Sequence, residues 1–138
     1  MTDCVFCRIV AGDLPATFVF QDHDVVGFLD LFPVVPGHTL IVPRRHATDL
    51  LDCPGDLAGR LFAASARVAA AVLKATGADG FNVWSANGQA AGQTVFHLHL
   101  HVLPRFAADR FGLRFPIERR EASRGELEAM ASRIRLKA

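Results

Sequence analysis

The chain has 138 residues, of which 51% are hydrophobic and 21% charged. This size and composition predict one compact globular domain spanning residues 1–138. Fifteen Lys and Arg against 14 Asp and Glu give a formal net charge of +1, which argues against a protein that grips a nucleic-acid backbone. No apolar run has membrane-spanning length and the first residues do not resemble a signal peptide, so we expect a cytoplasmic protein with no membrane partner.

The first part of the chain predicts a short helix followed by strands. Residues 4–11 carry apolar side chains typical of a helical turn, and Gly12 ends the pattern. Three short runs rich in β-branched and aromatic residues follow, with a Pro and Gly turn cluster before the third, which favours an antiparallel meander. The predicted strands are residues 17–20, 25–29 and 39–42.

The second part predicts one long helix, two strands and a short C-terminal helix. Apolar residues recur at helical spacing from Pro54 to Gly77, so this helix should cover the sheet. Residues 81–85 and 95–103 are expected to be strands, and residues 126–136 a terminal helix. The fold class is therefore α+β: a five-stranded antiparallel sheet with the helices on one face.

Three histidines alternate with apolar residues in the second of those strands. His97, His99 and His101 are two residues apart, so a strand directs all three imidazoles to one face, with successive rings about 7 Å apart. An isolated histidine in a strand is usually a polar residue whose hydrogen bonds are all made. Burying three of them on one face only to form a core would cost free energy, because each polar ring must be desolvated. The pattern indicates a reactive surface that acts on one small ligand.

Neutral imidazole is a competent nucleophile near neutral pH because its pKa lies near 6.5. Attack on phosphorus gives a phospho-histidine linkage that water can hydrolyse, while neighbouring imidazoles donate hydrogen bonds to the charged oxygens. His99 has a histidine on each side and is the predicted nucleophile. His101 is the predicted acid or phosphate donor.

Residues 87–94 form a loop rich in Gly and amide side chains that enters the histidine segment. It has no acidic side chain, its glycines allow close approach of a ligand, and Gln93 or Thr94 could donate to phosphate oxygens. Considered alone, this segment is typical of an ordinary polar loop that connects two strands. Its position beside the histidines favours a phosphate site.

Three cysteines, an odd number, argue against a disulfide framework. The spacing of Cys4 and Cys7 suits a redox pair or a metal, and no thioredoxin-like pattern surrounds them, which favours zinc with two further ligands. Cys53 is given no role.

Residues 92–105 resemble the signature of the histidine triad (HIT) superfamily. Upstream, Cys4-Val5-Phe6-Cys7, then residues 28–30 and 36–43, are similar in order and spacing to its bacterial nucleotide-binding branch. The resemblance covers residues 4 to about 116.

This resemblance implies a hydrolase or transferase acting at the α-phosphate of adenosine or other purine nucleotides, such as a phosphoramidate or a dinucleoside polyphosphate, without bound magnesium. It implies that His99 takes up the nucleotidyl group and that His101 contacts phosphate and assists the leaving group. His38 matches a fourth histidine beside the triad. Family members are usually homodimers whose two sheets join, so we expect a homodimer.

The resemblance also implies a nucleotide-binding set. Asp30 matches a carboxylate that holds the ribose hydroxyls, although it could instead cap the following turn. The positions matching phosphate contacts are Asn87, Gln93 and Thr94. The positions matching the slot for the base, which would be core in most domains, are Val5, Phe6, Ile9, Phe28 and Leu31.

Relatives with the cysteine pair resemble galactose-phosphate uridylyltransferases, in which zinc also binds the first triad histidine and one upstream histidine. Mapped onto this chain, the implied zinc ligands are Cys4, Cys7, His46 and His97, although His46 could instead be a solvent-facing residue of a polar loop. Such closed coordination is structural and leaves His97 unavailable for proton transfer. Two positions depart from the family pattern: Phe115 replaces a frequent Trp, and Trp84 stands where an aliphatic residue is common.

Two alternatives remain open. A zinc-dependent hydrolase would use the histidine cluster as metal ligands and metal-bound water as nucleophile. A non-catalytic nucleotide-binding protein would use the same cleft for binding only.

Overall fold

The computed structural model describes residues 3–109 and 119–135, and confirms the predicted α+β architecture. Five antiparallel strands form one sheet in the order β1-β2-β3-β5-β4. The strands are β1 (Phe18–Gln21), β2 (Val25–Leu29), β3 (Thr39–Pro43), β4 (Gly80–Trp84) and β5 (Leu100–Arg105).

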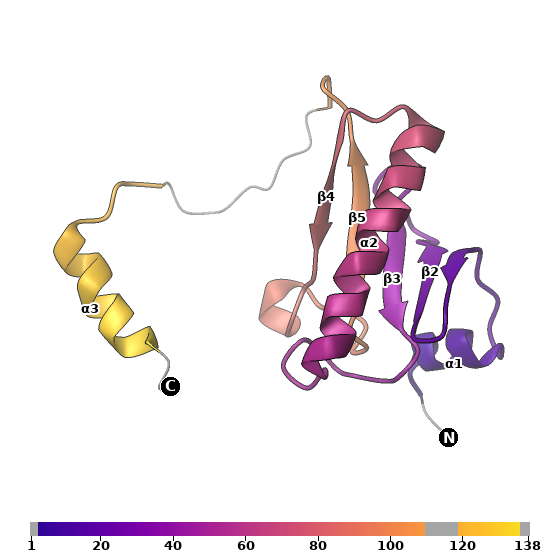
Figure 1. The fold of residues 1–138 in the computed structure, drawn as a ribbon, viewed down its shortest axis with the longest axis horizontal. Helices are drawn as coiled ribbons and strands as arrows, with labels where there is room; N and C mark the ends of the chain where they lie inside the picture. Colours follow the sequence, from indigo (N-terminus) through magenta and orange to yellow (C-terminus); the bar gives the residue numbers. More distant parts are fainter. Residues whose placement is uncertain (1–2, 110–118, 136–138) are drawn as a thin grey trace.

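Helix α2 (Gly55–Thr76) covers one face of this sheet (Figure 1). Its predicted apolar stripe is buried there, from Leu57 through Leu61 to Val72. The stripe packs on Ile41 and on the inward side chains of β5. Gly77 ends the helix in the left-handed conformation, with φ 71° and its N–H bonded to the Leu73 carbonyl.

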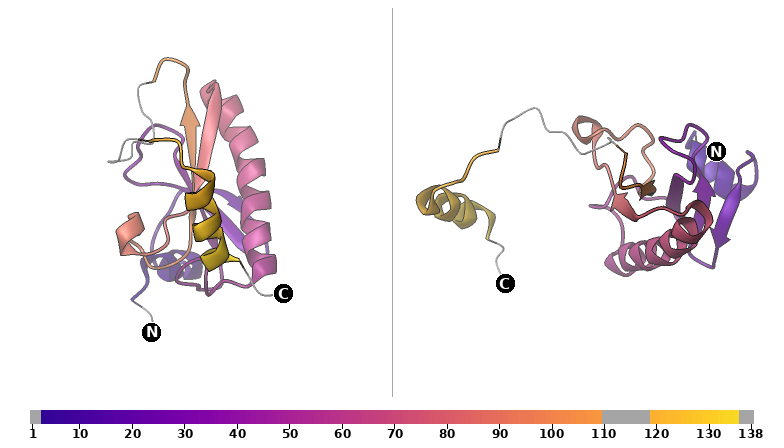
Figure 2. Two further views of the ribbon diagram at one scale, coloured as in Figure 1. Left: turned by 90° about the vertical axis from the view of Figure 1, so that its left-hand side faces the viewer. Right: turned by 90° about the horizontal axis from the view of Figure 1, so that it is seen from above.

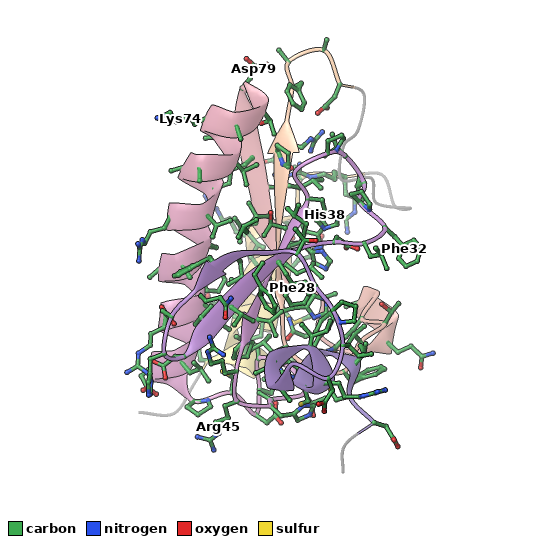
Figure 3. All side chains as sticks on the ribbon, turned by 90° about the vertical axis from the view of Figure 1, so that its right-hand side faces the viewer. Phe28, Phe32, His38, Arg45, Lys74 and Asp79 are labelled. Atoms are coloured by element: carbon green, nitrogen blue, oxygen red, sulfur yellow. The ribbon has the colours of Figure 1, made fainter. Side chains whose placement is uncertain are left out.

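Helix α1 (Val5–Ala11) lies on the opposite face, so the expectation that the helices share one face is wrong. The reason is that β2 and β3 carry apolar side chains on both faces, and each face needs a cover. Phe6 of α1 packs on the second core cluster, which contains Val26, Phe28, Leu40 and Val42. Figure 3 shows α2 on one side of the sheet and Phe32 projecting from the other side.

The histidine strand starts later than predicted, at Leu100 rather than at residue 95. The backbone before it leaves the ladder, because the Leu98 N–H donates to the Ala47 carbonyl at 2.7 Å. The predicted alternation nevertheless holds: Leu98 and Leu100 belong to the core under α2, and the histidines face the other side.

Helix α3 (Arg124–Ile134) agrees with the predicted terminal helix. It stands apart from the sheet in Figure 1 and in the right view of Figure 2. Its predicted apolar side, Leu127, Met130 and Ile134, is about half to two-thirds exposed, at 49%, 48% and 65%. No helix within the described ranges combines the length and apolar character that a membrane crossing requires.

Candidate active site

The triad rings gather on the face covered by α1. The Phe6 ring meets His97 and His99 edge to face, with centroids 5.9 and 5.1 Å apart. The ring centroids of His99 and His101 are 5.0 Å apart. His97 and His99 are buried and His101 is half-buried, so α1 closes one side of a histidine surface that stays open at His101.

One backbone hydrogen bond fixes the chemical state of His99. Its Nδ1 lies 2.7 Å from the His97 carbonyl oxygen, and since a carbonyl can only accept, we assign the proton to Nδ1. Burial lowers the pKa of His99, outweighing that hydrogen bond and the charge of Asp30. The neutral ring therefore keeps a lone pair on Nε2, as a nucleophile requires.

The state of His101 follows from a chain of donors. The Val34 N–H donates to His38 Nδ1 at 3.2 Å, which leaves the His38 proton on Nε2, directed at His101 Nδ1 2.9 Å away. His101 therefore carries its own proton on Nε2. Burial, with His99 and His38, lowers the pKa of His101 to about 4 despite the opposing charge of Asp30, so at neutral pH it is an uncharged hydrogen-bond donor.

Four side chains from three parts of the chain converge as the predicted metal ligands. His97 Nδ1 lies 3.3 Å from Cys4 Sγ, 3.5 Å from Cys7 Sγ and 3.2 Å from His46 Nδ1. All four ligand atoms lie within 4.8 Å of one another. Bond lengths to tetrahedral zinc place its ligand atoms roughly 3.3–3.8 Å apart, so these residues fit zinc.

The second nitrogen of His97 supports the same assignment. His97 Nε2 lies 2.8 Å from the Pro43 carbonyl oxygen, so the proton sits there and Nδ1 presents a lone pair to the cysteines. A backbone acceptor on the far nitrogen is the usual support for a metal-binding histidine. His97 therefore belongs to the metal cluster, while His99 and His101 lie outside it.

Asp30, His38 and His101 also place three ligand atoms within 4.8 Å. His38 has no lone pair to offer a metal there, because Val34 occupies Nδ1 and the Nε2 proton is shared with His101. The cluster is a hydrogen-bonded group rather than a metal site.

A cleft of about 980 Å³ opens in front of His99 and His101. All five residues predicted for the base slot line it, as do Asp30 and Thr94. Sequence reasoning missed nine further lining residues, most of them in loops whose placement depends on tertiary contacts. They are Leu14, Pro15, Ala16, Thr17, Leu29, Phe32, Pro33, Leu40 and Val95.

Asp30 makes the turn contact that the simpler interpretation predicts and also faces the cleft. Its Oδ1 accepts the Phe32 N–H at 2.9 Å, and its Oδ2 lies 3.6 Å from His38 Nε2. The turn uses only one carboxylate oxygen. Oδ2 therefore keeps acceptor capacity on the cleft side.

The side chains of Asn87 and Gln93 form hydrogen bonds with the backbone of the loop and of neighbouring segments. Asn87 Oδ1 accepts the Leu50 N–H at 2.8 Å. Buried Gln93 accepts the Gly88 N–H and donates to the carbonyls of Thr48 and Val95. Neither side chain lines the cleft, so in this structure both hold the loop in shape and leave Thr94 facing the ligand space.

Comparison with known proteins agrees with this geometry. Residues 11–108 match the model of the HIT domain. The chain belongs to the HIT family. A crystal structure of SMU.412c from Streptococcus mutans superposes with a TM-score of 0.91 at 45% identity, covering 97% of this chain and 84% of that one.

The names of two other HIT relatives mention a bound metal and an enzymatic activity. A zinc-bound histidine triad protein from Mycobacterium smegmatis is 39% identical, with a TM-score of 0.78 over 96% of this chain and 95% of that one. Adenylylsulfatase HINT3 of Arabidopsis thaliana is 38% identical over 107 residues, covering 78% of this chain and 54% of the relative.

Proposed function

We propose that this HIT protein is a hydrolase or transferase acting at the α-phosphate of adenosine nucleotides, with a phosphoramidate or a dinucleoside polyphosphate as substrate. The observation that carries the proposal is neutral His99, which keeps the lone pair on Nε2 and lines the cleft beside the donor His101. A relative named as an adenylylsulfatase adds support.

The reaction has two displacements. His99 Nε2 bonds to the α-phosphorus while the bond to the leaving group breaks, and the leaving group departs with that electron pair and takes up a proton from solvent. The His101 Nε2–H donates to a phosphate oxygen or to the leaving atom as charge develops. Water then attacks the same phosphorus and breaks its bond to His99 Nε2, which releases the nucleoside monophosphate; the proton that water loses to solvent balances the one taken up by the leaving group. Neither displacement requires magnesium.

The substrate is placed by the cleft walls. The base lies among the apolar side chains around Phe6 and Phe28, and the ribose hydroxyls meet Asp30 Oδ2. Thr94 donates to the phosphate. Asn87 and Gln93 act on the phosphate indirectly, by fixing the loop that carries Thr94.

The four-residue cluster of Cys4, Cys7, His46 and His97 holds zinc. Bound there, the metal would supply a structural crosslink between the N-terminal segment and the triad segment. This crosslink would help to keep Phe6 of α1 against His99.

The protein acts as a homodimer whose two sheets join at an edge strand. Among the described strands, β4 pairs with β5 alone, so its outer backbone groups are open to a second copy.

The function is tested by following AMP release from an adenosine phosphoramidate and a dinucleoside polyphosphate. We expect wild type to turn over at least one of them and His99→Gly to lose at least a hundredfold in rate, since the variant has no nucleophile. His23→Gly is the matched control, because the His23 side chain is 98% exposed and lies outside the cleft. Equal rates for wild type and His99→Gly would remove His99 from this role.

A further inference from the structure

The single tryptophan of the chain lies against the active-site histidine that donates to phosphate. Trp84 ends strand β4 and stands opposite His101 in the register of β4 and β5. The two rings are stacked, with centroids 5.0 Å apart and planes 16° apart. Among the described residues, Trp84 stacks on His101, and not on His99 or on a histidine of the metal cluster. Its effect should therefore act through His101.

His101 needs two constraints to aim its proton. The hydrogen bond from His38 Nε2 to His101 Nδ1 holds one edge of the imidazole. Nδ1 lies close to the Cβ–Cγ axis about which the ring turns, so a moderate rotation of the plane changes that bond only slightly. The His38 and His99 rings meet His101 at 41° and 62°, so neither lies flat on it. Among these three neighbours, only Trp84 is nearly parallel to its plane.

We propose that Trp84 is a positioning residue, which holds the plane of His101 so that its Nε2–H points into the cleft. The proposal rests on the proposed function, because it gives His101 the role of donor to the transferred phosphate. An aliphatic side chain at this position would leave the hydrogen bond from His38 intact and release the ring plane. The effect should therefore fall on the chemical step rather than on substrate binding.

The indole face has a second, measurable effect on His101. A cation over an aromatic face is stabilised, so Trp84 favours the protonated ring, as Asp30 does, while His38 and His99 oppose it. Replacing Trp84 with Leu should lower the midpoint of His101 protonation by roughly half a pH unit. Loss of the parallel ring should also remove the ring-current shift of the His101 ring protons.

The first test uses proton NMR of the whole protein, with the His101 signals assigned by their absence in His101→Gln. We expect Trp84→Leu to move these signals and to lower their titration midpoint, and Trp84→Phe to show a smaller change. Phe81→Leu is the matched control: Phe81 lies on the same strand, opposite Pro104, and its parity places it on the α2 side. A His101 spectrum unchanged in Trp84→Leu overturns the proposal.

The second test compares kcat and KM. Trp84→Leu should lose ten- to a hundredfold in kcat with KM within about twofold, Trp84→Phe should recover most of the rate, and Phe81→Leu should match wild type. Wild-type kcat in a folded Trp84→Leu contradicts the proposal. If wild type itself turns over neither substrate, the proposed function fails, and the NMR test still decides whether Trp84 holds the His101 ring.

Discussion

At the scale of single residues, the chemistry of this site is set by main-chain groups. The carbonyl of His97 places the proton of His99, the N–H of Val34 orders the pair of His38 and His101, and the carbonyl of Pro43 turns His97 toward the cysteines. Three similar imidazoles are thus held in three different settings, which match the three roles proposed for them: nucleophile, donor and metal ligand.

The lowered pKa of His101 predicts how stability depends on pH. The pKa is near 6.5 in the unfolded chain and about 4 in the folded protein, so below pH 6.5 the unfolded chain binds more protons and the fold loses stability. The His101 proton should therefore leave the free energy of unfolding unchanged above about pH 7 and should lower it as the pH drops from 6.5 toward 4.

Urea unfolding at several pH values, for wild type and His101→Gln, measures this dependence. The free energy of unfolding should fall less steeply with acid in the variant. Identical slopes for the two proteins would show that His101 does not titrate in this way.

At the scale of elements, the sequence predicts those helices and strands whose formation depends on interactions between residues close together in the chain. The β-prone run at 25–29 and the apolar stripe of α2 with its glycine cap were enough to predict these two elements, because β-propensity, helical periodicity and capping act within one element. The start of β5 was not predictable, because Leu98 bonds to Ala47, 51 residues away in the chain. The side of the sheet taken by α1, and the inward turn of Gln93, likewise depend on partners from distant segments.

The attachment of α1 predicts the effect of metal removal. The proposed zinc would link Cys4, which caps α1, and Cys7 within α1 to His97 and His46, so a chelator should lower the melting temperature by several degrees. Turnover at 25 °C should persist, because His99 and His101 are not ligands. Circular dichroism and AMP release, measured with and without chelator, give the two readouts. Loss of all turnover with unchanged circular dichroism would favour a zinc hydrolase instead.

At the scale of the whole molecule, one sheet face is closed by α2 and the other is shared between α1 and the cleft. The sheet edge at β4 lies next to the active-site strand β5. Pairing of two copies through β4 would therefore build one ten-stranded sheet with both clefts on a rigid support, a stable basis for aligned catalytic groups.

Sedimentation equilibrium at micromolar concentration tests this assembly. The measured mass should be twice that of one chain and should not change across a tenfold dilution. A species with the mass of a single chain throughout would reject the homodimer.

His99 is proposed to carry the nucleotidyl group between two displacements at phosphorus. The direct measurement is the stereochemical course of hydrolysis of an adenosine phosphorothioate substrate, chiral at the α-phosphorus, in isotopically labelled water. Two in-line displacements each invert the configuration at phosphorus, so we expect net retention. Net inversion would mean a single attack by water and would contradict a histidine-bound intermediate.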